Sequence, residues 1–230
     1  MKKIVIGDIV SRAWDLAVKH WPIFVLLTFV NSALSGLGMS IDPEDYITGI
    51  QTNSPEMIAE AVKVTPWLAV AVLIGIYLGY VILNLYVNAS RTGKPYSTMS
   101  EAFKVDINQL AIYFVVDLCL AFIIAIGCSL CVLPGIWLGV RLCYAPLLAA
   151  TQGASFTESF SRSWEMTKGN FWDLFLMGLT MIGIAILGFC ACCVGYYFAA
   201  VVIYFMYVLS FYALKADDAP AQAGDYVEVQ

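Results

Sequence analysis

The sequence predicts an all-α integral membrane protein with about six membrane-spanning helices in three hairpins. Of its 230 residues, 61% are hydrophobic and only 13% are charged, and the mean hydropathy is +0.81. Soluble domains are about 45–50% apolar and about 25% charged. A bilayer accommodates this much apolar surface, whereas a water-soluble core does not. We expect one membrane domain over residues 1–215 and a disordered acidic tail over residues 216–230.

The membrane spans follow from length, because a helix crosses a bilayer with about 20 mostly apolar residues. Suitable segments cover residues 21–37, 66–87, 110–127, 131–150, 171–189 and 194–214. The last four segments form two hairpins with very short turns. A polar loop over about 40–65 joins the first two, and we expect a helical stretch in it near 55–64.

The basic residues indicate the orientation, since Lys and Arg concentrate on the cytoplasmic side. With six spans, one side holds Lys2, Lys3, Arg12, Lys19, Arg91, Lys94, Lys104, Arg162, Lys168 and Lys215. The other side holds only Lys63. We therefore expect a multi-pass protein of the cell membrane, of the bacterial inner-membrane kind. Both termini should be cytoplasmic and the 40–65 loop exterior.

An internal repeat divides the chain. Residues 11–16 read Ser-Arg-Ala-Trp-Asp-Leu, and residues 161–166 read Ser-Arg-Ser-Trp-Glu-Met. A weaker copy covers residues 100–105. Each copy precedes a hairpin, which predicts units of about 5–90, 94–152 and 154–215 in a pseudo-threefold arrangement.

The repeated segment should form a short amphipathic helix. Phe156, Phe160 and Trp164 recur at helical spacing, and Ser155 with Glu158 fits a capping box. Such a helix lies in the cytoplasmic headgroup layer, with Trp at the interface. The alternative is a cytoplasmic extension of the following membrane helix.

The second half of the chain resembles the membrane domain associated with glycerophosphoryl diester phosphodiesterases and related bacterial membrane proteins. The residues that carry this resemblance are Pro134, Gly135, Arg141, Ser161, Trp164, Lys168, Gly169 and Trp172. In the fused members of the family, a separate soluble domain performs the catalysis. The resemblance therefore implies a membrane module, without implying catalysis.

Asp117 lies in the third predicted span, Arg141 lies in the fourth, and Asn84 and Asn88 lie near the inner end of the second. An ionisable residue in a span is a functional hypothesis, because burying a charge in lipid is costly. The structural alternative is a buried pair that locks a hairpin. Asp117 and Arg141 fall at similar depth on adjacent helices. We expect a direct or water-bridged contact between them.

Cysteines occupy matching positions in the two tight turns: Cys128 and Cys131 in one, and Cys190, Cys192 and Cys193 in the other. Three interpretations remain open. The residues are small apolar turn residues, they form disulfides, or Cys128, Cys131, Cys190 and Cys193 bind a metal.

No catalytic motif supports an enzyme, and His20, the single histidine, reads as an interfacial polar residue. We predict no cofactor and no nucleic-acid partner, because no basic patch is present. The predicted function is a non-enzymatic membrane module that engages phospholipid or a membrane protein partner. The alternative is a small-solute or lipid transporter, although the sequence lacks the broken-helix pairs of many transporters.

Overall fold

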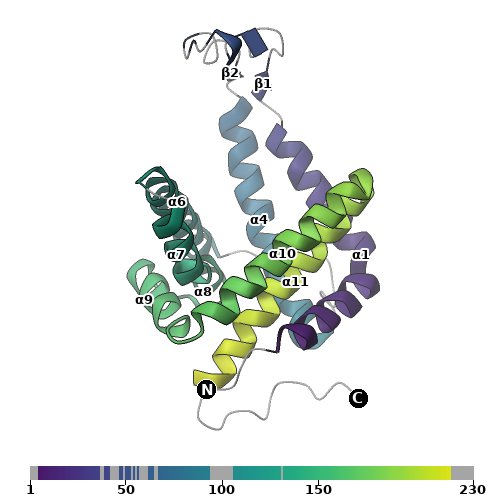
Figure 1. The fold of residues 1–230 in the computed structure, drawn as a ribbon, viewed down its shortest axis with the longest axis vertical. Coiled ribbons are helices and arrows are strands. Elements are labelled where there is room, and N and C mark those ends of the chain that lie inside the picture. The colour runs from purple at the N-terminus through teal and green to yellow at the C-terminus, as the bar shows by residue number, and fades with distance from the viewer. Residues whose placement is uncertain are drawn as a thin grey trace. The chain divides into compact units, whose positions relative to one another are not determined.

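The computed structural model describes residues 5–36, 39–41, 47–48, 50–52, 54, 56, 62–64, 67–93, 106–130 and 132–218. Within them, six helical segments are long and apolar enough to cross a membrane. They are Ile6–Leu34, Val70–Thr92, Ile107–Ser129, Leu133–Gln152, Phe171–Cys190 and Gly195–Lys215. The chain is therefore a multi-pass integral membrane protein, as predicted (Figure 1).

Two compact units make up the chain. The smaller unit covers Leu26–Gly79, and the larger unit combines Met1–Val25 with Tyr80–Gln230. Helix α1 (Ile6–Gly36) is divided between the two units, and so is helix α4 (Trp67–Thr92). All the candidate site residues described below belong to the larger unit.

The smaller unit contains a two-stranded antiparallel sheet. Strand β1 (Met39–Ile41) pairs with β2 (Val62–Val64), with Ile41 opposite Val62 and Met39 opposite Val64. The prediction of a helical stretch near 55–64 is therefore wrong for residues 62–64, which form strand β2. The two β-branched valines of β2 favour a strand over a helix.

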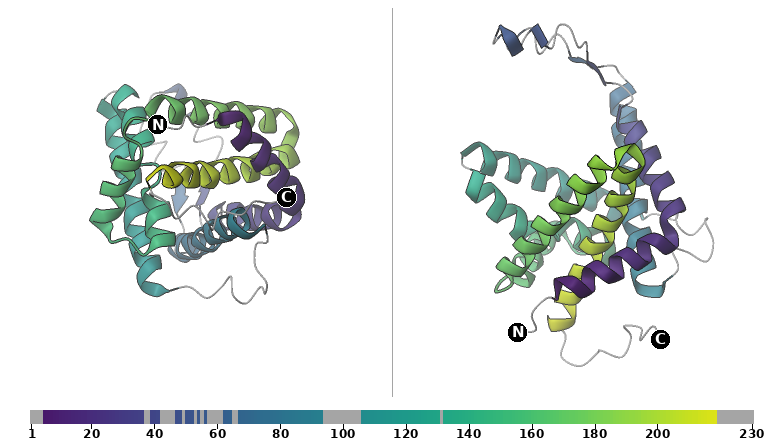
Figure 2. Two further views of the ribbon diagram at one scale, coloured as in Figure 1. Left: turned by 90° about the horizontal axis from the view of Figure 1, so that it is seen from below. Right: turned by 45° about the vertical axis from the view of Figure 1, so that its right-hand side comes forward.

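The larger unit contains the two hairpins with tight turns. Helix α6 (Ile107–Leu130) packs against α7 (Val132–Leu142) and α8 (Ala145–Gln152). Helix α10 (Phe171–Cys190) packs against α11 (Cys192–Asp218), as Figure 2 shows from two sides. Helix α11 continues to Asp218, three residues into the predicted tail, and residues 219–230 lie outside the described residues.

Glycines allow the close approach of the helices at both turns. A Cβ atom added to Gly127 would lie 2.9 Å from the Cα atom of Gly135. In the other hairpin, a Cβ atom added to Gly188 would lie 2.9 Å from the carbonyl oxygen of Gly195. Side chains at these positions would force the paired helices apart, so both turns depend on glycine.

The short helices predicted before the hairpins differ among the three copies. Helix α9 (Phe156–Met166) is separate from α10, because Gly169 lies between them with a positive φ of 93°. The first copy instead continues into the membrane span as the single helix α1, which contains Pro22. For that copy, the alternative of a helical extension describes the structure. The middle copy, 100–105, lies outside the described residues.

An aromatic cluster forms the core of the larger unit. The rings of Phe24, Tyr86 and Phe205 are fully buried. Phe24 stacks on Tyr86 with ring centroids 4.2 Å apart, and Phe205 meets both rings edge-on. This cluster joins α1, α4 and α11, so the N-terminal segment is an integral part of the larger unit.

Candidate functional site

The fourth membrane span is broken near its middle. The sequence predicts one continuous helix, but the structure has α7 up to Leu142 and α8 from Ala145 onward. Pro146 lies at the start of α8. Its ring nitrogen cannot donate a hydrogen bond to the carbonyl of Leu142, and its ring collides with the preceding turn. The predicted continuity is therefore wrong, because a proline inside a span ends the helix before it.

Side chains from other elements bond to the backbone carbonyls at the break. The hydroxyl of Ser163 on α9 donates to the carbonyl oxygen of Arg141 over 3.0 Å. The hydroxyl of Thr167, at the end of α9, lies 3.1 Å from the same oxygen and 2.9 Å from the carbonyl oxygen of Ser163, so it is shared between the two acceptors. The hydroxyl of Tyr207 on α11 donates to the carbonyl oxygen of Cys143 over 2.6 Å. A carbonyl left unpaired in lipid costs several kcal/mol, roughly. These donors therefore make a broken helix tolerable at membrane depth.

The guanidinium group of Arg141 lies between two tryptophans, at 5.6 Å from the ring centre of Trp137 and 5.3 Å from that of Trp164. The two indoles meet edge-on, with centroids 5.1 Å apart. Cation–π contacts of this kind contribute about 0.5–2 kcal/mol, depending on how far they are desolvated. However, the Nε and Nη1 atoms of Arg141 are buried without a hydrogen-bond partner. The aromatic rings stabilise the charge but leave these donors unused.

Asp117 and Arg141, both among the described residues, form no direct ion pair, so the direct form of the predicted contact is wrong, whereas a water-bridged contact stays a prediction. In the described part of the chain, the one ion pair joins Arg162 to Glu158. Asp117 instead lies close enough to the hydroxyl groups of Tyr113 and Tyr204 for electrostatic interaction. Arg141 points to α9 rather than to α6 because α7 turns it toward Trp164, so similar depth did not bring the two charges together.

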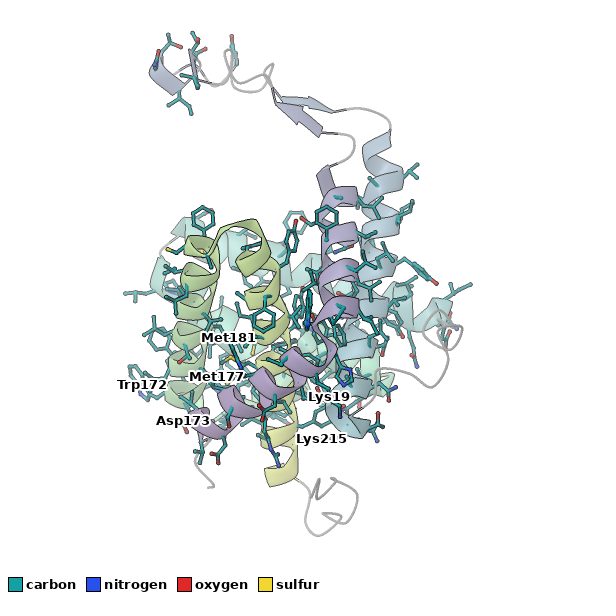
Figure 3. All side chains as sticks on the ribbon, turned by 90° about the vertical axis from the view of Figure 1, so that its right-hand side faces the viewer. Lys19, Trp172, Asp173, Met177, Met181 and Lys215 are labelled. Atoms are coloured by element: carbon teal, nitrogen blue, oxygen red, sulfur yellow. The ribbon has the colours of Figure 1, made fainter. Side chains whose placement is uncertain are left out.

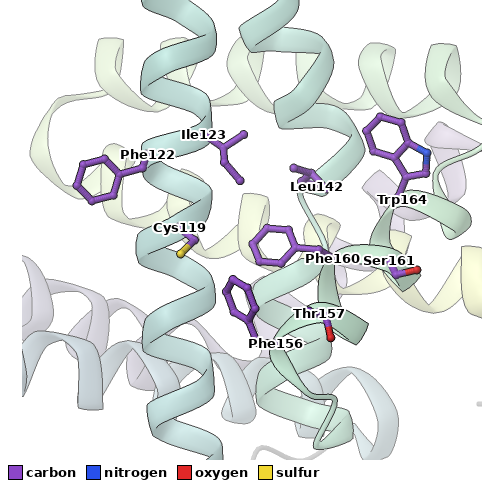
Figure 4. Close-up of a pocket in the computed structure, with 9 residues that line it drawn as sticks. All are labelled: Cys119, Phe122, Ile123, Leu142, Phe156, Thr157, Phe160, Ser161 and Trp164. Atoms are coloured by element: carbon purple, nitrogen blue, oxygen red, sulfur yellow. The ribbon is translucent and has the colours of Figure 1, made fainter.

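An apolar groove lies between α6 and α9, and one of its walls is Trp164, the indole that contacts Arg141. Its volume is about 650 Å³. Phe156 and Phe160 extend from α9 toward α6, and Leu142 lies between the two helices (Figure 4). The full lining is Cys119, Phe122, Ile123, Leu142, Phe156, Thr157, Phe160, Ser161 and Trp164. Trp164 thus belongs both to the groove wall and to the cage around Arg141.

The opposite face of α9 is charged. Ser155 and Glu158 form the predicted capping box at its start. Glu158 also pairs with Arg162 at 2.6 Å, and both side chains are more than two-fifths exposed. Exposed pairs at this spacing contribute only about 0.3–0.5 kcal/mol. Helix α9 is therefore amphipathic as predicted, with its aromatic face on the groove.

Comparison with known proteins agrees with the resemblance seen in the sequence. Residues 107–215, from α6 into α11, match the membrane domain of glycerophosphoryl diester phosphodiesterase. The resemblance is confirmed. The matched region contains the broken span, the tryptophan cage and the groove.

Relatives extend the likeness to most of the chain. Uncharacterized protein Rv2560 of Mycobacterium tuberculosis is 27% identical over 209 residues, which cover 83% of this chain and 62% of that protein. Uncharacterized protein Mb2590 of Mycobacterium bovis has the same identity and coverage. The chain thus spans less than two thirds of the length of these relatives. No solved structure matches it.

The residues that carry the family resemblance have distinct positions in the membrane domain. Gly135 provides the close approach at the turn, Gly169 provides the positive φ before α10, and Arg141 and Trp164 form the cage. The remaining four are exposed: Pro134, Ser161, Lys168 and Trp172. Ser161 nevertheless lines the groove, and Trp172 is 71% exposed at the start of α10.

The other predicted polar residues have local partners. The amide of Asn84 donates to the carbonyl of Tyr80 on its own helix, and the backbone carbonyl of Asn88 accepts from Thr92. His20 lies 3.0 Å from the carbonyl oxygen of Gly93, just beyond the end of α4. This bond supports the interpretation of His20 as a structural polar residue.

The turn cysteines can be compared only in part. Cys128 and Cys190 are exposed free thiols. Cys131 lies outside the described residues, and the side chains of Cys192 and Cys193 are likewise not described. Among the described residues, no group of three His, Cys, Asp or Glu side chains could hold a metal ion. The metal and disulfide interpretations of the remaining cysteines stay predictions.

Site residues that the sequence analysis did not single out include Ser163, Thr167, Tyr207 and Trp137. Ser163 and Thr167 are fully buried, and they bond to a carbonyl that is free only because of the break. The signal was Pro146, which lies within a predicted span. A proline in a span releases carbonyls, so polar hydroxyls near it in space are expected.

Proposed function

We propose that the protein is a non-enzymatic integral membrane module that holds a membrane lipid in the groove between α6 and α9. The groove carries the proposal. Its volume of about 650 Å³ falls within the about 300–1,000 Å³ of small-molecule sites. Its walls are mostly apolar and aromatic, which suits hydrocarbon rather than a polar solute.

The occupant is a lipid because of where the groove lies. Phe122 and Phe156, at its walls, are 59% and 40% exposed. Helix α6 is a membrane span, so these exposed rings face the bilayer when the protein is in place. Acyl chains are then the most abundant apolar molecules at the groove.

We also propose that the membrane domain consists of three repeated hairpin units, related by rotation about an axis along the membrane normal. The first and third copies support this arrangement. Residues 9–20 and 159–170 have the same order of buried, half-buried and exposed positions, with Ile9, Ala13 and Ala17 corresponding to Ser159, Ser163 and Thr167.

Each of the two copies also packs in the same way against the hairpin of the unit before it. For the first copy, the unit before it is the third unit, so the three proposed units form a closed ring. Trp14 meets Phe198 of α11 edge-on, with centroids 5.2 Å apart and an angle of 80°. Trp164 meets Trp137 of α7 edge-on, at 5.1 Å and 86°. We name the contact of Trp14 with α11 the first docking site, and the contact of Trp164 with α7 the second docking site.

The proposed orientation places both termini in the cytoplasm. Figure 3 shows Lys19 and Lys215 at the end of the larger unit where Asp173 begins α10. Lys215 is in the last turn of α11, so α1 and α11 bring basic residues to one side. In a background without the native cysteines, of which Cys128 and Cys190 are exposed, a cysteine placed near residue 50 should react with an impermeant maleimide from outside, and one placed near residue 94 should not. The reverse pattern would contradict the orientation.

The broken fourth span is the one observation that favours the alternative, a transporter. In transporters, carbonyls at such breaks coordinate ions. Here the carbonyls of Arg141 and Cys143 accept hydrogen bonds from Ser163, Thr167 and Tyr207. The break therefore supports a structural role better than an ion site, and transport remains the second candidate.

Native mass spectrometry of gently extracted protein tests the proposal. We expect the protein to retain phospholipid, and we expect Ile123→Trp, which fills the groove, to reduce the retained amount severalfold. A matched control is Leu179→Trp, since Leu179 is an exposed residue of α10 outside the groove. Equal retention by both variants would show that lipid binds elsewhere. Uptake of a radiolabelled solute or lipid by proteoliposomes would favour the transporter instead.

A further inference from the structure

We propose that Arg141 binds the phosphate of an anionic glycerophospholipid whose acyl chain occupies the groove between α6 and α9. This inference rests on the proposed function and names the class of headgroup that the site takes. It joins two features that share Trp164: an apolar groove and a cation with unused donors.

The first observation is the state of the guanidinium group. Its Nε and Nη1 atoms are buried and have no hydrogen-bond partner among the described residues, and no carboxylate there pairs with Arg141. A buried charged donor without an acceptor is costly, so such groups are normally paired. The guanidinium group binds phosphate well, because its planar set of donors matches phosphate oxygens.

The second observation is that the fold itself does not need this cation. Arg141 lies four residues after Trp137, which is the ring that Trp164 contacts. At the first docking site, the residue four positions after Phe198 is Val202, which is only 1% exposed. The same tryptophan docking forms there around an apolar side chain. The charge at the second site is therefore an addition to the packing and requires its own explanation.

The third observation is the position of the guanidinium group beside an amphipathic helix. Amphipathic helices lie at the boundary between headgroups and acyl chains. Arg141 contacts Trp164 of α9, and Leu142, the next residue, lines the groove. A phosphate at Arg141 would thus be adjacent to an acyl chain in the groove. This adjacency of charge and apolar wall is the pattern of a single amphipathic ligand.

The ligand should be anionic overall. A zwitterionic headgroup needs a carboxylate or aromatic partner for its ammonium group. Near the groove, Glu158 is already paired with Arg162, and the cage indoles are occupied by Arg141. The described residues thus offer the phosphate a cation, and no carboxylate pairs with Arg141 to offset its charge.

The test compares two phospholipids that have identical palmitoyl and oleoyl chains. Delipidated protein in mild detergent is titrated with phosphatidylglycerol or phosphatidylethanolamine, and native mass spectrometry counts the bound lipid. We expect the wild-type protein to prefer phosphatidylglycerol about tenfold, which corresponds to about 1.4 kcal/mol. Both lipids present a phosphate to Arg141, but only phosphatidylethanolamine carries an ammonium group that offsets the phosphate charge. Equal binding of both lipids by the wild-type protein would overturn the inference without any variant.

Variants then locate the preference. Arg141→Gln should weaken phosphatidylglycerol binding more than phosphatidylethanolamine binding, so that the preference is lost. Arg162→Gln, the matched control, removes an exposed cation from α9 and should keep the preference. If Arg141→Gln keeps the preference, the inference fails while the proposed function stands. If the wild-type protein binds neither lipid, or if Ile123→Trp binds both normally, the proposed function itself fails.

Discussion

The first and second docking sites show the same packing with different chemistry. At both, a tryptophan of a repeated helix meets an aromatic ring of the preceding hairpin edge-on, where the last hairpin counts as preceding the first repeat. Around the first tryptophan, the buried positions are the apolar Ile9, Ala13 and Ala17. At the second, they are Ser159, Ser163 and Thr167. The edge-on ring contact is common to both docking sites and is therefore a property of the fold. The different buried side chains show what is specific to the second docking site.

The serine and threonine side chains follow from the backbone of the partner helix. Helix α11 is continuous over Cys192–Asp218, so its carbonyls near the first docking site are bonded within the helix. Alanine is sufficient beside such a helix. The break between α7 and α8 leaves the carbonyl oxygen of Arg141 available. The hydroxyl groups of Ser163 and Thr167 lie within hydrogen-bonding distance of it. Proline in one hairpin thus requires hydroxyls on the helix that packs against it.

The largest effect should come from removing those hydroxyls. The double variant Ser163→Ala/Thr167→Ala leaves the carbonyl of Arg141 unpaired, and we expect the free energy of unfolding to fall by about 2–4 kcal/mol. Ser159→Ala is the control, because its hydroxyl bonds only to Ser155 of the same helix turn. Equilibrium unfolding in mixed micelles measures both. A similar loss for Ser159→Ala would show that the hydroxyls act through packing alone.

A second comparison concerns the two tight turns, which we expect to respond alike. A Cβ atom at Gly135 would lie 2.7 Å from the backbone nitrogen of Cys128, and one at Gly195 would lie 2.8 Å from the carbonyl oxygen of Gly188. Backbone atoms cannot move aside cheaply, so Gly135→Ala and Gly195→Ala should each destabilise by about 1–3 kcal/mol.

Gly139→Ala provides the control for both turns. Its added Cβ atom would meet only the side chain of Ile124, at an ordinary 3.8 Å. Alanine also favours a helix over glycine by roughly 0.5–1 kcal/mol. Gly139→Ala should therefore be neutral or slightly stabilising under the same unfolding conditions. Destabilisation of only one turn would argue against equivalent hairpins.

The sequence alone predicted the elements that depend on composition and spacing. Apolar runs located the six spans, and the capping box of Ser155 and Glu158 located the start of α9. These features are local, since they depend on residues within one or two helical turns. The amphipathic pattern likewise identified Phe156, Phe160 and Trp164 as one face.

The site could not be predicted to the same degree, because its contacts join distant segments. The predicted contact between Asp117 and Arg141 depends on their similar depth in the membrane. Depth does not determine how each helix is rotated about its own axis. That rotation turns Arg141 toward Trp137 and Trp164. The break at Pro146 is visible in the sequence, but its hydroxyl partners lie 22, 26 and 64 residues from the carbonyls that they contact, so only the fold identifies them.

The docking tryptophans should differ modestly in their contributions to stability. Trp14 and Trp164 are 51% and 37% exposed and form matching ring pairs. Trp164 also stacks on Arg141. We therefore expect Trp164→Ala to destabilise more than Trp14→Ala, by about 0.5–2 kcal/mol, the range of a cation–π contact. In an Arg141→Gln background, this excess should disappear. An excess that persisted would have to come from the groove wall rather than from the cation.

The smallest effect should be the coupling between Asp117 and Arg141. An ion pair would make each single neutralisation strand a charge, so that the double variant loses less stability than the two single losses combined. The structure instead gives Arg141 two indoles, and it places Asp117 near the hydroxyls of Tyr113 and Tyr204. Residues without shared partners are additive to within about 0.3–0.5 kcal/mol.

We therefore expect the losses of Asp117→Asn and Arg141→Gln to add within that margin in a double-mutant cycle of unfolding free energies. Trp164→Ala with Arg141→Gln serves as the positive control, because those side chains are in contact and should couple. Coupling between Asp117 and Arg141 as strong as that control would mean that the two charges meet in the folded protein. The cage of Trp137 and Trp164 would then no longer account for how the membrane domain tolerates Arg141.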